Sequence, residues 1–174
     1  MHATYDLIAP TSVWAYHDGA KPPEPGWQGR DYNDSKWKSG RGLFGFGTGD
    51  EVTSLASDGE EKPESVTAYF RRDFTVEAPA AARSLLLGLT CADGAAVYLN
   101  GQEIFRANLP AGAKHKDNAP AAASDRGLMC RFSELDAKGL CAGKNVIAVE
   151  VHRHNGQASG MRFDLNLSLR PKEK

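Results

Sequence analysis

Hydrophobic and polar residues alternate along much of the second half of the chain, and this pattern predicts β-strands. In the clearest run, Met161, Phe163, Leu165, Leu167 and Leu169 alternate with Arg162, Asp164, Asn166 and Ser168. A period of two is typical of a strand with one buried face. The same pattern predicts further strands over residues 68–76, 84–91 and 145–154.

A β-hairpin is predicted around residues 95–105, where Asn100-Gly101 separates two short alternating runs. Asn and Gly accept the two positive-φ positions of a type I′ turn, so the flanking runs should pair antiparallel. A Gly-containing turn precedes the first run at Asp93-Gly94. The hairpin argues for an all-β domain.

The remaining segments are predicted to be short strands and loops. Residues 1–66 read as irregular apart from a short strand within 42–49, and 51–67 and 108–127 read as long loops. A short strand is expected at 128–132 and a helical turn within 133–140, and no amphipathic helix of about ten or more residues is apparent. We therefore expect residues 1–174 to form a single domain, an antiparallel β-sandwich of two sheets in a jelly-roll arrangement.

The amino-acid composition gives no support for nucleic acid or a membrane as a binding partner. Lys and Arg total 21 against 22 Asp and Glu, for a formal charge of −1, so nothing favours nucleic acid or an anionic membrane. No apolar run approaches the roughly 20 residues of a membrane helix, and the N-terminus lacks the pattern of a secretory signal.

The chain has three cysteines, an odd number, so they cannot all be paired in disulfide bonds. Cys91 is expected in the core, and Cys130 and Cys141 either form a bridge or stay free.

Several short motifs, taken in order, resemble one known family. They are Trp14 and the segments 31–37, 44–47, 68–74, 93–101 and 145–152. Together they resemble the galactose-binding-like jelly roll. The chain is similar to the sugar-binding-like domain of β-galactosidase-type glycoside hydrolases and to accessory modules of secreted bacterial hydrolases and metallophosphoesterases. Two positions depart from the close relatives: Cys91-Ala92-Asp93 replaces consecutive acidic residues, and Gly160-Met161 replaces a common Asp.

The resemblance implies a carbohydrate-binding module without catalytic activity, covalently linked to a larger hydrolase and working in an extracellular or periplasmic setting. It also implies structural calcium, which many members carry. Other members only brace a neighbouring catalytic domain. A structural or protein-interaction module without a glycan site is therefore the alternative, because fold alone does not establish function.

Five residues are predicted to contact carbohydrate. Trp27 follows a Pro-rich loop and is the best candidate for an exposed ring that stacks on a sugar. Tyr69, Arg71, Glu150 and His152 face outward from predicted strands and would line one groove, with Asp164, if those strands are neighbours. The alternatives are that Trp27 covers the end of the core and that Arg71 and Glu150 form a salt bridge.

Acidic side chains supply the oxygen ligands that calcium prefers, and the sequence predicts a calcium site. The predicted ligands are Asp31, Asp34 and Asp164. Asp31 and Asp34 could instead stabilise their own turn. His152 and His154, with Asp164 as a third ligand, form a weaker zinc candidate. Arg72 shares the phase of the core-facing residues and is expected to clamp a buried acceptor.

Catalytic motifs are absent from the sequence. The glycines at 45, 47 and 49 lack the Lys-Ser/Thr of a phosphate loop, and no Gly-x-Ser-x-Gly elbow occurs. Glu150 and Asp164 are the one carboxylate pair that could serve a glycosidase, if they lie about 5–10 Å apart. The sequence therefore favours a binding module, with a small enzyme as the least favoured alternative.

Overall fold

The computed structural model describes residues 4–46, 49–55, 66–91, 94–120, 129–154 and 161–173, without the side chains of residues 129 and 130. Strands dominate it, and the described residues contain one short 3₁₀ turn, η1 (Pro79–Ala81). The strands of the first sheet, sheet A, are β1 (Tyr5–Ile8), β4 (Phe44–Phe46), β5 (Thr53–Ser54), β7 (Ala82–Cys91), β10 (Met129–Asp136) and β12 (Met161–Pro171). The strands of the second sheet, sheet B, are β2 (Val13–His17), β3 (Lys38–Arg41), β6 (Thr67–Val76), β8 (Gly94–Leu99), β9 (Gln102–Ala107) and β11 (Gly143–His152).

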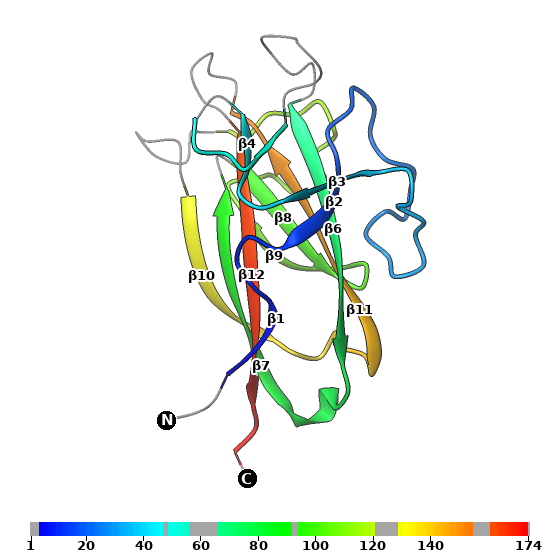
Figure 1. The fold of residues 1–174 in the computed structure, drawn as a ribbon, viewed down its shortest axis with the longest axis vertical. Coiled ribbons are helices and arrows are strands. Elements are labelled where there is room, and N and C mark those ends of the chain that lie inside the picture. The colour runs from blue at the N-terminus through cyan, green and yellow to red at the C-terminus, as the bar shows by residue number, and fades with distance from the viewer. Residues whose placement is uncertain are drawn as a thin grey trace.

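The two sheets pack face to face (Figure 1). Sheet A has the order β10-β7-β12-β4-β5, with β1 also paired to β12, and sheet B has the order β3-β2-β6-β11-β8-β9. Pairing is antiparallel except between β4 and β5. The predicted two-sheet, all-β sandwich is confirmed.

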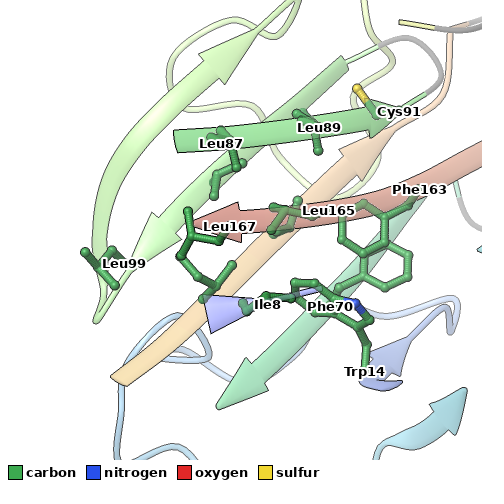
Figure 2. Packing of buried hydrophobic residues seen from close by; sticks show 14 of the residues in the cluster. Ile8, Trp14, Phe70, Leu87, Leu89, Cys91, Leu99, Phe163, Leu165 and Leu167 are labelled. Carbon is green, nitrogen blue, oxygen red and sulfur yellow. The ribbon is translucent and has the colours of Figure 1, made fainter. Parts of the chain in front are cut away.

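The core lies between the sheets and is filled by the alternate residues that the sequence pattern assigned to it. Leu165 and Leu167 of β12 are at most 1% exposed and meet side chains from sheet B (Figure 2). Phe70 stacks on Phe163 across the layers, with 3.9 Å between ring centroids. Trp14 is fully buried and packs edge-on against Phe163 at 5.1 Å. These contacts supply most of the apolar burial that stabilises the sandwich.

The predicted hairpin joins β8 to β9. Asn100 and Gly101 have φ angles of 53° and 91°, as the two central residues of a type I′ turn require. The Asn100 amide also donates to Asn145 Oδ1 at 2.8 Å, and its oxygen accepts from the Val146 backbone at 2.9 Å. The turn is thereby fixed to β11, the neighbouring strand of sheet B.

Two parts of the secondary-structure prediction were wrong. A helical turn was expected within residues 133–140, but β10 continues to Asp136 because it pairs with residues 84–91 of β7. Only residues 137–140 form a turn, in which the Leu140 amide donates to the Ala137 carbonyl at 3.1 Å. The region 1–66, expected to be irregular, contributes β1, β2, β3 and the short β5 besides the predicted strand at β4. These strands are short and show little alternation of hydrophobic and polar residues. Pairing with neighbouring strands in the sheets stabilises them.

The cysteine prediction is resolved for two residues. Cys91 is buried in the core, as expected. Cys141 is a free thiol, so the alternative of a Cys130–Cys141 bridge is wrong. Among the residues described, none belongs to a helix long and apolar enough to cross a membrane.

Candidate functional site

Four of the predicted ligand-binding residues lie on one face of sheet B. Tyr69 and Arg71 come from β6, and Glu150 and His152 come from β11, the neighbouring strand. Glu150 stands directly opposite Tyr69 in the register. The intervening residues of both strands enter the core, so these four side chains point to the outer face. The condition that their strands be neighbours is met for this set.

The protein's own loops cover this face. Residues 18–37, between β2 and β3, lie beside sheet B in Figure 1, and residues 108–120 follow β9. As a result Tyr69, Arg71 and His152 are at most 3% exposed, and Glu150 is 8% exposed. A groove that opens directly onto these residues is therefore not formed.

Arg71 holds the first loop on the sheet. Its guanidinium donates from Nε to Asp34 Oδ2 at 2.8 Å, and from Nη1 to the backbone carbonyls of Trp27 and of Gly29, the latter at 3.0 Å. Its charge also lies 5.2 Å from the centre of the Tyr32 ring. A buried cation needs such acceptors to offset its lost hydration. The expected Arg71–Glu150 salt bridge is wrong, because loop acceptors occupy the guanidinium.

Trp27 packs against the sheet beneath this loop. Its ring meets Tyr69 edge-on at 4.9 Å and Tyr98 at 5.6 Å, above the small side chain of Ala148. The residue is 7% exposed. The prediction of an exposed stacking ring is therefore wrong, and Trp27 covers the outer face of sheet B rather than the end of the core. The Trp37 ring lies beside Trp27, with 6.5 Å between ring centroids, and Trp37 is half-buried.

Glu150 and His152 form the centre of a second buried group. Tyr98 donates its hydroxyl proton to Glu150 Oε1 at 2.6 Å, and His152 Nε2 lies 3.2 Å from Glu150 Oε2. His152 Nδ1 lies 2.7 Å from the backbone oxygen of Asp117. Because a carbonyl oxygen only accepts, Nδ1 carries a proton in that contact. Burial, together with the charge of Glu150, raises the pKa of the Tyr98 hydroxyl above its ordinary value.

The second loop is fixed through Tyr69 and His115. The Tyr69 hydroxyl lies 3.1 Å from His115 Nδ1, and the two rings stack with centroids 5.7 Å apart. Thr67 Oγ1 donates to the His115 carbonyl at 2.7 Å. Burial raises the pKa of Tyr69 and lowers that of His115, because each environment disfavours the charged form.

The predicted metal ligands do not come together. Asp34 accepts from Arg71 above sheet B, whereas Asp164 accepts from the backbone amides of Thr11 and Leu165 in sheet A, at 3.0 and 2.9 Å. Burial raises the pKa of Asp164. Asp31 is exposed. Within the described ranges no group of three or more His, Cys, Asp or Glu side chains could hold a metal ion.

Asp31, Asp34 and Asp164 therefore cannot bind one calcium ion together. The predicted zinc ligands, His152, His154 and Asp164, likewise do not come together at one ion. Asp164 belongs to sheet A, whereas His152 is the last residue of β11 in sheet B and His154 comes two residues later. Calcium bound elsewhere stays a prediction, which thermal unfolding with and without a chelator would test.

A glycosidase-type acid pair is likewise not formed. Glu150 points outward from sheet B, and Asp164 points outward from sheet A, with the hydrophobic core between them. Stacked sheets are about 10 Å apart, so two carboxyl groups on opposite outer faces exceed the separation that glycosidases use. The expectation that Asp164 shares a groove with Arg71 and Glu150 is wrong for the same reason.

Sequence reasoning missed Tyr98 and His115 in this arrangement. Tyr98 lies between Val97 and Leu99, which are both fully buried, so alternation alone would have placed its ring on the outer face. His115 belongs to a loop, and no pattern in the sequence indicates that it stacks on Tyr69. Tyr32 and Trp37, in the same loop as Trp27, pack against each other with ring centroids 5.8 Å apart.

Comparison with known protein families and with characterised protein sequences gives no match. Solved structures do share the fold. Bacteroides uniformis β-glucuronidase 2, bound covalently to cyclophellitol-6-carboxylate aziridine, aligns with 98% of this chain at a TM-score of 0.62 and 17% identity. A β-glucuronidase from an uncultured Clostridium species aligns with 99% of the chain at a TM-score of 0.58 and 14% identity.

A glycosyl hydrolase family 2 member from Bacteroides cellulosilyticus DSM 14838 aligns with 95% of the chain at a TM-score of 0.56 and 16% identity. The chain has the fold of one part of these glycoside hydrolases. It spans 18%, 30% and 20% of the three matched chains in the order given. The resemblance to a sugar-binding-like jelly roll is thus confirmed as a likeness of fold, for a module far smaller than the enzymes it matches.

Proposed function

We propose that the protein is a non-catalytic carbohydrate-binding module that serves a larger glycoside hydrolase. The observation that carries the proposal is the size of the match: 98% of this chain aligns with only 18% of one β-glucuronidase. A chain of this kind corresponds to one module within an enzyme that acts on glycosides. The proposal includes a covalently linked catalytic domain and an extracellular or periplasmic setting.

The absence of catalysis is proposed from the placement of the acidic residues. Glu150 is occupied by Tyr98 and His152, and Asp164 lies on the other sheet. Glycoside hydrolysis needs two carboxyl groups that flank one bond. Incubation with p-nitrophenyl β-D-glucuronide and β-D-galactopyranoside should release no p-nitrophenol beyond the buffer rate, and turnover that Glu150→Gln removes would contradict the proposal.

Carbohydrate binding is tested by native affinity electrophoresis. Gels containing hydroxyethylcellulose, xyloglucan, galactomannan, arabinoxylan or polygalacturonate should retard the protein in at least one case, relative to a gel without polysaccharide. Bovine serum albumin in the same gels corrects for viscosity. Unretarded migration in every gel, confirmed by a glycan array without signal, would remove the proposal.

A second candidate is a structural or protein-interaction module of the same fold. It is favoured by one observation: Trp27, Tyr69, Arg71 and His152, the side chains that were expected to bind sugar, hold the protein's own loops instead. A module of this kind would show no retardation by any polysaccharide and would co-elute in size-exclusion chromatography with the catalytic domain of its enzyme.

A further inference from the structure

An exposed aromatic side chain stands on the outer face of sheet A, away from the covered face of sheet B. Phe132 of β10 is 85% exposed, more than any other large hydrophobic residue among those described. In the register Phe132 lies opposite Gly88 of β7, and Gly88 lies opposite Asn166 of β12. The three residues thus form one row across adjacent strands, with a ring at one end and an amide at the other.

Gly88 leaves the middle of this row open. A Cβ atom at Gly88 would lie 2.2 Å from Asn166 Oδ1 and 2.9 Å from its Cγ. The Asn166 amide therefore lies over the Gly88 backbone, on the side toward Phe132. Asn166 has no hydrogen-bonding partner for its amide within the part of the chain that the structure describes, so donor and acceptor both remain available.

A shallow hollow of about 370 Å³ surrounds this row. Its lining includes Leu86, Gly88, Phe132, Ser133, Asn166 and Ser168. The volume is at the lower end of the range for small-molecule sites, which suits one or two sugar rings rather than a long groove.

Charge on this surface is compensated. Glu134, at the edge of the hollow, accepts from Arg170 Nη1 through both carboxylate oxygens at 2.8 Å and from the Ser84 hydroxyl at 2.5 Å. The hydrogen bond from Ser84 and the neighbouring charge of Arg170 lower the pKa of Glu134. An anionic ligand would find no unpaired cation among the lining residues.

We infer that this hollow binds an uncharged pyranose unit of a glycan, with Phe132 stacked on the C–H face of the sugar and Asn166 hydrogen-bonded to its hydroxyl groups. The inference rests on the proposed function and names its site. An aromatic face beside a free amide is the combination that pyranose recognition requires. The Ser168 hydroxyl already donates to Asp6 Oδ1 at 2.8 Å. A protein partner fits less well, because no second exposed large hydrophobic side chain lines the hollow, and stable protein interfaces bury about 1,000 Å² or more.

The test compares Phe132→Ala, Asn166→Ala and Phe132→Trp with the unsubstituted protein on the neutral polysaccharides named above. Phe132→Ala should weaken binding about tenfold, Asn166→Ala by a smaller factor, and Phe132→Trp should retain it, because a larger ring also stacks. Tyr5→Ala, which removes another exposed aromatic ring at 60% exposure, is the matched control and should bind normally. Thermal unfolding should be unchanged in all four variants.

Each contrary outcome has a distinct meaning. Wild-type binding that both alanine variants retain would overturn this site and leave the proposed function standing. A wild-type protein that binds no polysaccharide would overturn both. Binding to polygalacturonate alone would contradict the inference that the ligand is uncharged, because polygalacturonate is anionic. If Phe132→Ala converts a dimer to a monomer in analytical ultracentrifugation without changing retardation, the hollow is a protein contact and the inference fails.

Discussion

The Arg71 Nε atom in β6 donates to Asp34 Oδ2 at 2.8 Å, joining residues 37 positions apart in the chain. The Arg71 side chain is fully buried, whereas the Asp34 side chain keeps 33% of its surface exposed. The pair ties the loop of residues 18–37 to sheet B. The same loop carries Trp27 into contact with Tyr69, so this ion pair decides what covers that face of the sandwich.

Arg71→Ala should lower the free energy of unfolding by about 3 kcal/mol, because it leaves buried carbonyl groups and one carboxylate without their donor. Urea unfolding measures the change. Asp73→Ala on the same strand is the control: it breaks an exposed pair with Lys144 and should cost less than about 1 kcal/mol. Equal effects in the two variants would show that Arg71 does not anchor the loop.

Trp27→Ala should destabilise the protein by about 3 kcal/mol, because it empties the space between Tyr69 and Tyr98. A ring that only stacked on sugar would leave thermal unfolding unchanged. Differential scanning calorimetry separates the two roles. Tyr5→Ala serves as the surface control, and a Trp27→Ala melting temperature equal to that of this control would restore the stacking role.

Stability should fall as the pH drops through the titration range of His115. Burial lowers the pKa of His115 from its ordinary value of 6.5, so the unfolded chain takes up the proton first. The stability that the neutral, buried His115 contributes is fully present above pH 6.5. It is lost as the pH falls toward the lower pKa that His115 has in the folded state. His115→Gln should make the urea midpoint depend less on pH between about 7.5 and 5. Lys114→Gln, in the same loop, should leave that dependence as in wild type.

Gly88→Ala should displace the Asn166 amide while preserving the fold. The added Cβ would meet the end of a flexible side chain rather than backbone, so the melting temperature should change by only a few degrees. Glycan retardation should weaken as in Asn166→Ala. Retained binding in Gly88→Ala would indicate that the position of the amide over β7 does not matter for the ligand.

The sequence predicted the sandwich because its strongest signals are local. Alternation in β6, β7, β11 and β12 identifies the residues that face the core, and Asn100-Gly101 identifies the hairpin from two adjacent residues. The condition that the strands be neighbours is met for Tyr69, Arg71, Glu150 and His152, but not for Asp164, which lies in the other sheet. The short strands β1, β2 and β3 were missed because their pairing partners lie far away in the chain.

The sequence alone thus determined the all-β class, the core faces and the turn between β8 and β9, since each follows from side-chain periodicity or local backbone preference. Only the tertiary structure decided which polar residues remain open to a ligand. Alternation places a side chain on the outer face of a strand but does not tell whether a loop returns to cover it. Arg71 is covered and Phe132 is not, and that difference arises from contacts between distant segments that no local pattern encodes.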